Sequence, residues 1–320
     1  MMKRSLAGAC CTLIASCMAA TLSVPVLAAG PAAVPAMKAR LAAKVPMTGL
    51  VRAGDALLAL GDYGTVVRSI DHGRSWQQAV VPVNTLLTSA HFIDSQRGWA
   101  VGHGGTLLAT TDGGLNWVLQ QILEDKPVLL SVYFASADVG YAVGAYGSAW
   151  RTGDGGRSWS AMTVGEGDDA DMHLNQLFAT RDGTLFIAAE MGLAFRSEDG
   201  GTRWQRLETG VSGSLWSGLE GAGGEVVLLG MSGRVLVSQD RGDSWQVHED
   251  ASGQSLTGAV QAADGSLLVV GAGGLVLRGR ERFTAEIRAD RQNLAAVQRA
   301  ADGAVVVAGQ LGVERLTTDR

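Results

Sequence analysis

Short apolar runs separated by turn residues recur along the chain from about residue 48 onward. In one clear copy the runs are Leu87–Phe92, Gly98–Gly102, Thr106–Thr110 and Asn116–Ile122, and they are rich in β-formers and bounded by Gly and Asp. No stretch of ten or more residues shows the 3.6-residue spacing of an amphipathic helix. The pattern therefore predicts four-stranded antiparallel meanders and an all-β fold.

A tetrad of the form Gly-x-x-Gly lies between the second and third strand of each copy, with alanine first in the fourth copy. The tetrads begin at residues 61, 102, 144, 189, 230, 271 and 309, with separations of 41, 42, 45, 41, 41 and 38 residues. Glycine supplies the positive φ that tight hairpins need. A period near forty that is built of short strands is typical of propeller blades. We predict a seven-bladed β-propeller over residues 48–320.

An Asp-box, Ser/Thr-x-Asp-x-Gly-x-x-Trp, follows the third strand in five copies. We predict that its aspartate accepts hydrogen bonds from turn amides and that its tryptophan is buried. An aspartate repeated in every box indicates a structural role, because an active site is built only once. The residues are Asp71, Asp112, Asp154, Asp199 and Asp240, with Trp76, Trp117, Trp159, Trp204 and Trp245.

The last two copies depart from this pattern. Residues 277–283 carry no Asp-box, with Phe283 in the place of the tryptophan, and the seventh copy reaches only the start of a box at 317–320. Propellers close their rings by borrowing a strand from the other terminus. We therefore predict a ring closed by an N-terminal segment, in which Lys38–Pro46 supplies the strand that the seventh blade lacks.

The N-terminus has the pattern of an export signal. Lys3 and Arg4 precede an uncharged apolar stretch from Leu6 to Leu27, and Val26-Leu27-Ala28 resembles a cleavage site. We predict a signal peptide over residues 1–28 and an Ala/Pro-rich lead over 29–47, so that the mature protein is periplasmic or secreted. In the alternative, the residues before Cys17 form a lipoprotein box and Cys17 is lipidated.

Composition excludes several classes of function. Cys10, Cys11 and Cys17 all lie in the predicted signal, so the mature chain has no disulfide, catalytic thiolate or cysteine metal site. Without the signal the charge is 24 basic against 31 acidic residues, a net of −7, which argues against nucleic acid as a partner. The five histidines show no paired spacing, and we expect no cofactor and no metal. The acidic run 166–171 is interpreted as a solvated loop, with calcium binding as the alternative.

The Asp-boxes, above all Thr110–Trp117, resemble the bacterial neuraminidase repeat. With the period, the blade count and the phrases Arg97–Gly102 and Gly140–Gly144, the chain resembles the photosystem II assembly and stability factor family over residues 48–320. That resemblance implies an exported, non-catalytic scaffold whose partner is a membrane protein or membrane complex, and we expect a monomer.

The same family is associated with an arginine-rich surface. Four arginines of this chain occupy one repeat position, just before the Asp-box. That position favours instead ion pairs with acids of neighbouring blades. The four are Arg68, Arg151, Arg196 and Arg278.

A carbohydrate-active propeller, either a glycosidase or a lectin, is the alternative. Glycoside hydrolysis needs two carboxylates at a fixed separation, or a tyrosine nucleophile in sialidases. Tyr133 and Tyr141 lie in strand patterns typical of a core, and xyloglucan hydrolases of this fold place two propellers across a cleft. This chain has one propeller, which favours binding over catalysis.

The predicted topology gives a position for a binding surface. Tetrads join the second and third strands and Asp-boxes join the third and fourth, so the two sets of turns lie at opposite ends of the ring. The links between blades emerge beside the tetrads and vary most in length, as a recognition surface does. The candidate partner-binding residues on this rim are Asp62, Tyr63, His103, Tyr146, Glu190, Met191, Met231 and Gln310.

Overall fold

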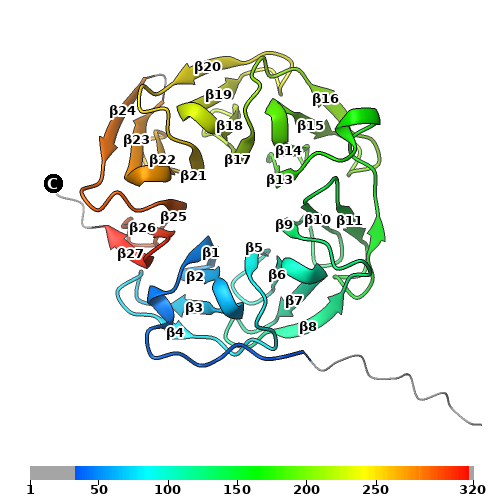
Figure 1. The fold of residues 1–320 in the computed structure, drawn as a ribbon, viewed down its shortest axis with the longest axis vertical. Helices are drawn as coiled ribbons and strands as arrows, with labels where there is room; N and C mark the ends of the chain where they lie inside the picture. Colours follow the sequence, from blue (N-terminus) through cyan, green and yellow to red (C-terminus); the bar gives the residue numbers. More distant parts are fainter. Residues whose placement is uncertain (1–32, 281, 317–320) are drawn as a thin grey trace, which may run out of the picture. The chain divides into compact units, whose positions relative to one another are not determined.

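Seven antiparallel sheets surround a central opening in the computed structural model, which describes residues 33–280 and 282–316 (Figure 1). Within each sheet the strands follow chain order from the inside of the ring to its edge. The all-β, seven-bladed propeller predicted from the repeat is confirmed. The predicted signal peptide lies outside the described residues.

The first four blades have four strands each. They are β1 to β4 (Met47–Ala53, Ala56–Gly61, Val66–Ser69, Gln77–Gln78), β5 to β8 (Leu87–Phe92, Gly98–Gly102, Thr106–Thr110, Val118–Ile122), β9 to β12 (Leu129–Phe134, Gly140–Gly144, Ala149–Thr152, Ser160–Ala161) and β13 to β16 (Leu174–Ala179, Leu185–Ala189, Ala194–Ser197, Gln205–Leu207).

Two four-stranded blades and one three-stranded blade complete the ring. They are β17 to β20 (Leu215–Glu220, Val226–Gly230, Arg234–Ser238, Gln246–Glu249), β21 to β24 (Leu256–Gln261, Leu267–Gly271, Leu275–Gly279, Phe283–Ile287) and β25 to β27 (Leu294–Arg299, Val305–Gly309, Gly312–Leu316). The short 3₁₀ turns are η1 (Ala42–Lys44), η2 (Asp62–Gly64), η3 (His103–Gly105), η4 (Gly167–Asp169), η5 (Glu190–Gly192), η6 (Met231–Gly233) and η7 (Ala272–Gly274).

The predicted strands of the second blade agree with the structure except at one boundary. The fourth strand, β8, begins at Val118 and not at Asn116. The reason is that Asn116 belongs to the Asp-box, where its backbone N–H and its side-chain amide both donate to the Asp112 carboxylate.

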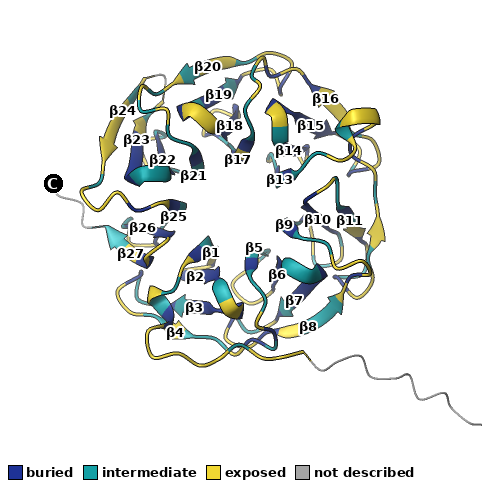
Figure 2. Cartoon of the chain, in the orientation of Figure 1, coloured by how far each residue is buried: buried dark blue, intermediate teal, exposed yellow. Residues whose placement is uncertain are grey.

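The core lies between blades and not within any one of them. The second strand of each blade is buried along its whole length, since both of its faces are covered by neighbouring blades (Figure 2). One cluster, for example, joins Leu58 and Val66 of the first blade to Leu87 and Ala100 of the second. Each blade therefore depends on its neighbours for most of its apolar burial.

The bulge in each inner strand places one side chain against the next blade. This bulge follows the first residue of the strand in all seven blades. In four blades the bulged side chain donates to a carbonyl of the next inner strand, over 2.5–2.8 Å: Thr48 to Leu87, Thr88 to Leu129, Asn175 to Leu215 and Thr257 to Leu294. The other three blades have Leu130, Trp216 and Ala295 at this position. We call these four bonds the inner locks.

The N-terminal segment lies where the first and last blades meet, but it does not supply a strand. Residues 42–44 form η1, which packs on β27, and the seventh sheet keeps three strands among the described residues. The prediction that Lys38–Pro46 supplies a fourth strand to the seventh blade is therefore wrong. The backbone of that segment is engaged elsewhere, because Ala39 N–H donates to the Gln78 side chain, which in turn donates to the Met37 carbonyl.

Direct packing and ion pairs complete the closure. Leu57 and Ala59 pack against Val306 and Ala308 of the last blade. Asp302 of that blade accepts from Arg74 of the first over 3.2 Å.

His91 in β5 gives the fold a predictable pH dependence. Burial lowers the pKa of His91 to about 4. Its Nδ1 accepts the N–H of Phe134. The unfolded chain protonates this side chain near its ordinary pKa of about 6.5 and the folded chain does not, so stability should fall as the pH drops from about 6.5 to 4. The expected loss is about 3 kcal/mol.

Urea unfolding at a series of pH values measures this effect. The His91→Gln protein should lack the slope between pH 6.5 and 4. A variant with the same slope as wild type would contradict the assignment to His91.

Candidate binding face

In each of the five Asp-boxes the aspartate carboxylate accepts hydrogen bonds from within its own turn. In the third blade, Thr152 Oγ1 and the Ser158 N–H donate to Asp154 Oδ1, and Ser158 Oγ donates to Oδ2 over 2.6 Å. The serine hydroxyls and amides hold the pKa of Asp154 and of Asp240 down at about 2. Asp71 and Asp112 make equivalent bonds through both oxygens. Asp199 accepts only through Oδ1, from the Ser197 hydroxyl and the backbone N–H of Arg203. A carboxylate held in this way is a turn acceptor and is not available as a general acid or nucleophile.

Each Asp-box is also held by the preceding blade. A side chain of that blade donates to the carbonyl that precedes the box glycine, over 2.6–2.9 Å. The pairs are Arg315 to His72, Arg68 to Gly113, Trp99 to Gly155, Tyr141 to Gly200, and Arg196 to Arg241. Arg315 was not recognised from the sequence, because the seventh hairpin is shorter and shifts the repeat position.

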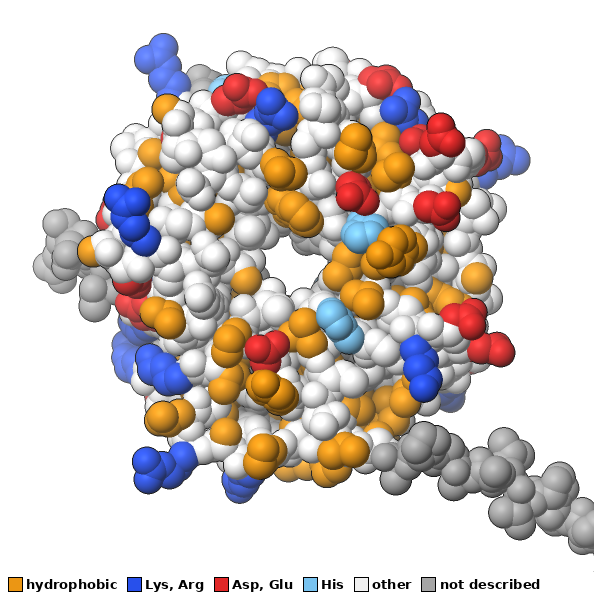
Figure 3. Space-filling view, viewed as in Figure 1, with side chains coloured by type: hydrophobic (Ala, Val, Ile, Leu, Met, Phe, Trp, Pro, Cys, Tyr) orange, Lys and Arg blue, Asp and Glu red, His pale blue; other side chains and the backbone are white. Residues whose placement is uncertain are grey.

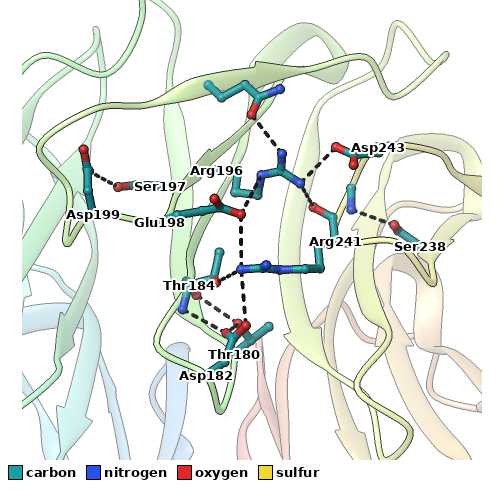
Figure 4. Close-up of polar contacts among 12 residues, drawn as sticks. Thr180, Asp182, Thr184, Arg196, Ser197, Glu198, Asp199, Ser238, Arg241 and Asp243 are labelled. Atoms are coloured by element: carbon teal, nitrogen blue, oxygen red, sulfur yellow. Dashed lines mark hydrogen bonds and ion pairs between the residues drawn. The ribbon is translucent and has the colours of Figure 1, made fainter.

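The repeated arginines therefore have mixed roles. Figure 4 shows Arg196 reaching the Arg241 carbonyl and, at 3.0 Å, the Asp243 carboxylate of the next blade. Arg241 returns to Asp182 and Glu198 of the fourth blade, each at 3.2 Å. Arg68 donates a hydrogen bond to the Gly113 carbonyl and not to an acidic residue. Arg151 and Arg278 are exposed and make no ion pair with a described residue.

The box tryptophans are less buried than predicted. Only Trp117 is fully buried, at 4 % exposure, and the other four are half-buried. The box lies at the outer part of the blade, so each indole wedges against the preceding blade with one edge toward solvent.

The tetrad turns lie at the other end of the ring, beside the links between blades. In every blade the N–H of the second tetrad residue donates, over 2.8–3.2 Å, to the carbonyl just before the inner strand. The pairs are Asp62 to Pro46, His103 to Leu86, Ala145 to Val128, Glu190 to His173, Met231 to Ser214, Ala272 to Ser255 and Gln310 to Asn293. We call this end the tetrad face.

Three large side chains occupy the third tetrad position, where the backbone has positive φ. Tyr63, Tyr146 and Met191 have φ of 56°, 54° and 58°, a region that costs a non-glycine residue about 1–2 kcal/mol. Tyr63 and Tyr146 are also 71 % and 77 % exposed, so no burial offsets that cost. Exposed apolar residues held in a strained conformation are typical of functional positions.

The other candidate residues differ in accessibility. Met231 and Gln310 are exposed, while Asp62, His103 and Glu190 are half-buried. The Glu190 carboxylate accepts a hydrogen bond from the backbone N–H of His173. The His173 ring packs edge-on against Tyr146, with ring centroids 4.8 Å apart. Glu190 therefore orders this part of the tetrad face and presents little of itself to a partner.

Trp216 belongs to the same face and was missed in the sequence. It follows Leu215, whose partner in β18 is the first tetrad glycine, so it lies at the tetrad end of the central channel. Its side chain is 40 % exposed, and β17 contacts η5, which carries Met191. A comparison of the second residue of the inner strand across the seven copies would have singled out Trp216.

The channel itself has a volume of about 310 Å³ and is lined by the inner strands of all seven blades. Its walls are mainly serine, threonine, glycine, asparagine and glutamine residues. Figure 3 shows hydrophobic side chains around the opening, with histidine and acidic side chains close to it. The arrangement presents apolar side chains on a face whose central channel has a polar lining without charged residues.

The described part of the chain offers little to a metal ion. No group of three His, Cys, Asp or Glu residues has the geometry to hold one there. In the acidic run, Asp169 lies in η4 and pairs with Arg206 at 3.0 Å. Over the same residues, no helix has the length and apolar character that a membrane span requires.

Comparison with known proteins gives a family match over more than half of the chain. The model for photosynthesis system II assembly factor YCF48 matches residues 68–129 and 119–274. The photosystem II assembly protein Ycf48 of Synechococcus sp. (strain JA-2-3B'a(2-13)) is 31% identical over 171 residues. This match covers 49% of the chain and 48% of that relative, so the chain spans about half of the relative's length.

Solved structures agree on the fold. A structure described as YCF48 bound to D1 peptide has a TM-score of 0.69 and 18% identity, and the match covers 90% of this chain and 100% of that one. YCF48 from Cyanidioschyzon merolae has a TM-score of 0.68 at 16% identity, with 88% and 97% covered. A streptogramin B lyase has a TM-score of 0.75 at 8% identity, with 86% and 94% covered. At these identities the structures establish the propeller alone, which binders and enzymes share.

Proposed function

The chain belongs to the family of photosynthesis system II assembly factor YCF48, and from this premise we propose that it is an exported, non-catalytic propeller that binds a membrane-protein complex and assists its assembly. The partner is a protein segment, which docks on the tetrad face. The observation that carries this proposal is the set of exposed Tyr63, Tyr146 and Met191 side chains, which are held at positive φ on the tetrad face.

The chemistry of this face suits a peptide more than a sugar. Aromatic and methionine side chains give large apolar contact area and adapt to different partners. The hydroxyl and amide side chains that line the channel can accept and donate hydrogen bonds, as an extended peptide requires. Two carboxylates placed for glycoside hydrolysis would have to come from outside the Asp-boxes, because those five are bound in turns.

Replacing the tetrad anchors tests the binding face. The Tyr63→Asn, Tyr146→Asn and Met191→Asn triple variant keeps the positive φ, which asparagine tolerates, and removes the apolar side chains. We expect loss of partner capture from detergent-solubilised membranes of the source organism, with thermal stability unchanged or slightly raised. Mass spectrometry of the captured material should show subunits of one membrane complex with the wild-type protein.

A matched control removes apolar surface from the opposite end of the ring. Ile70 and Leu115 are exposed residues of Asp-boxes, and the Ile70→Asn, Leu115→Asn variant should capture the same subunits as wild type. Equal capture by the triple variant, or loss of capture by the control, would rule out the tetrad face.

Export is part of the proposal and has its own test. N-terminal sequencing of protein from the periplasm or medium should give Ala29 as the first residue. A mature chain that begins at a lipid-modified Cys17 would favour the anchored form, and an intact N-terminus in the cytoplasm would exclude export.

A further inference from the structure

The junction between the fifth and sixth blades lacks both an inner lock and an Asp-box, whereas every other junction has at least one of the two. Its bulge residue is Trp216, which makes no inner lock to β21 among the described residues. In the sixth blade Gly279 pairs directly with Phe283, whereas in the fifth blade Val237 pairs with Gln246 across a full Asp-box. Phe283 takes the place of the box tryptophan, as predicted, and packs against the cluster that the two blades share. Its ring meets that of His248 with centroids 5.8 Å apart.

A cavity of about 390 Å³ occupies this junction. Val237 gives it an apolar wall, with the buried Val227 and Leu267 behind it, and His248 and two glutamines give it a polar wall. Its charged groups are Glu225 of the fifth blade and Arg280 of the sixth. A gap left by a degenerate repeat would not require a buried charge, so Glu225 is the informative residue.

Glu225 is deeply enclosed and incompletely bonded. It is 6 % exposed, and its Oε2 has no hydrogen-bond partner among the described residues. A glycine-rich loop makes room for it, because a Cβ at Gly221 would lie 2.3 Å from the Glu225 carboxyl carbon. A buried carboxylate oxygen without a donor is unfavourable, and a cationic donor is the group that best satisfies it.

Arg280 faces the same space from the other blade. A Cβ at Gly223 would lie 2.8 Å from Glu225 Oε2 and 3.3 Å from Arg280 Nη2, so both groups border one small gap. Among the described residues, Arg280 does not donate to Glu225 Oε2, which has no hydrogen-bond partner. A ligand that carries an ammonium group beside a carboxylate would complement both charges, with the ammonium at Glu225 and the carboxylate at Arg280.

We propose that this cavity is a binding site for a free α-amino acid with an aliphatic side chain. Its ammonium group donates to Glu225, its carboxylate accepts from Arg280, and its side chain packs on the partly exposed Val237. The site lies at the edge of the ring between two blades and does not depend on the tetrad face.

Calorimetric titration with three matched probes tests the proposal. L-leucine has both charged groups, isoamylamine lacks the carboxylate, and 4-methylpentanoate lacks the ammonium. Leucine should bind best, isoamylamine more weakly, and 4-methylpentanoate not at all. Glu225→Gln should weaken leucine binding by about tenfold or more, since it removes one charge-assisted bond. Arg280→Gln should weaken leucine binding and leave isoamylamine binding unchanged.

Two glycine variants separate occupancy of the cavity from folding. Gly223→Ala places a methyl group between the two charges and should abolish leucine binding. Gly153→Ala, at a position with nothing within 4 Å, should bind leucine as wild type does. Thermal melts of each variant report whether it is folded. The proposal is overturned if wild type binds neither amine, if Glu225→Gln or Gly223→Ala is folded and binds leucine normally, or if 4-methylpentanoate binds as well as leucine.

Discussion

The Gly147→Ala protein is expected to be less stable than wild type by about 2–5 kcal/mol. Gly147 has φ of +66°, and an added Cβ would lie 1.7 Å from the carbonyl oxygen of Ala170, the closest such approach at any described glycine. That oxygen belongs to the backbone of the link to the fourth blade, which the Gly147 N–H also holds by donating to Met172. The turn must therefore change conformation and separate from the link.

Gly104→Ala isolates the conformational part of this cost. Gly104 has almost the same φ, +67°, but a Cβ there would meet nothing within 4 Å. Its expected cost is about 1 kcal/mol, and tyrosine or methionine already occupies the third tetrad position in three other blades. Urea unfolding of the two variants measures the difference, and similar midpoints would mean that the close contact with Ala170 does not matter.

The Trp117→Ala protein should lose about 3–5 kcal/mol of unfolding free energy, as for the truncation of a buried aromatic residue. Trp117 is the fully buried Asp-box tryptophan, and its ring meets Phe92 edge-on at 5.9 Å. Its Nε1 donates to the Gly114 carbonyl inside the box. The indole also belongs to the cluster that contains Leu58 of the first blade, so its removal opens a cavity between two blades.

Trp216→Ala is the control, because it removes the same side chain from an exposed position. Trp216 belongs to neither of the buried clusters that its own blade forms with its neighbours, and its replacement should change stability by less than about 1 kcal/mol. Thermal denaturation followed by near-ultraviolet circular dichroism checks both variants. Equal losses of stability in the two variants would mean that burying Trp117 between two blades contributes no more than the exposed packing of Trp216.

Much of the architecture was predictable because the signals are local. Hairpin tetrads, Asp-boxes and apolar strands each occupy a few neighbouring residues, and three strands of the second blade were predicted to the residue. The failures arose where a residue's partner lies in another blade. The depth of each box tryptophan, the braces from Arg315 or Trp99 and the position of Trp216 all depend on how blades pack.

Ring closure shows the same limit. A missing strand in the last copy suggested a donor from the N-terminus, since strand exchange is the usual way to close a propeller. The N-terminal segment does lie between the two blades, but it contributes the 3₁₀ turn η1 and no strand. Ala42 of η1 belongs to the cluster in which Leu57 and Ala59 pack on Val306 and Ala308. Side-chain contacts between residues at opposite ends of the chain leave no local pattern to read.

Three features could be predicted without any structure: the number of blades, the opposite placement of tetrads and Asp-boxes, and the absence of cysteine from the part that follows the predicted signal. Those conclusions rest on a period and on turn chemistry, which are properties of short segments. By contrast, the packing of the blades was needed to show which tetrad side chains are exposed at positive φ and which are half-buried. The packing also leaves Glu225 Oε2 without a hydrogen-bond partner at the junction of the fifth and sixth blades. Among the described blades, this junction alone has neither an inner lock nor an Asp-box. Burial and pairing are set by neighbours that the fold brings together, so they cannot be read from one blade at a time.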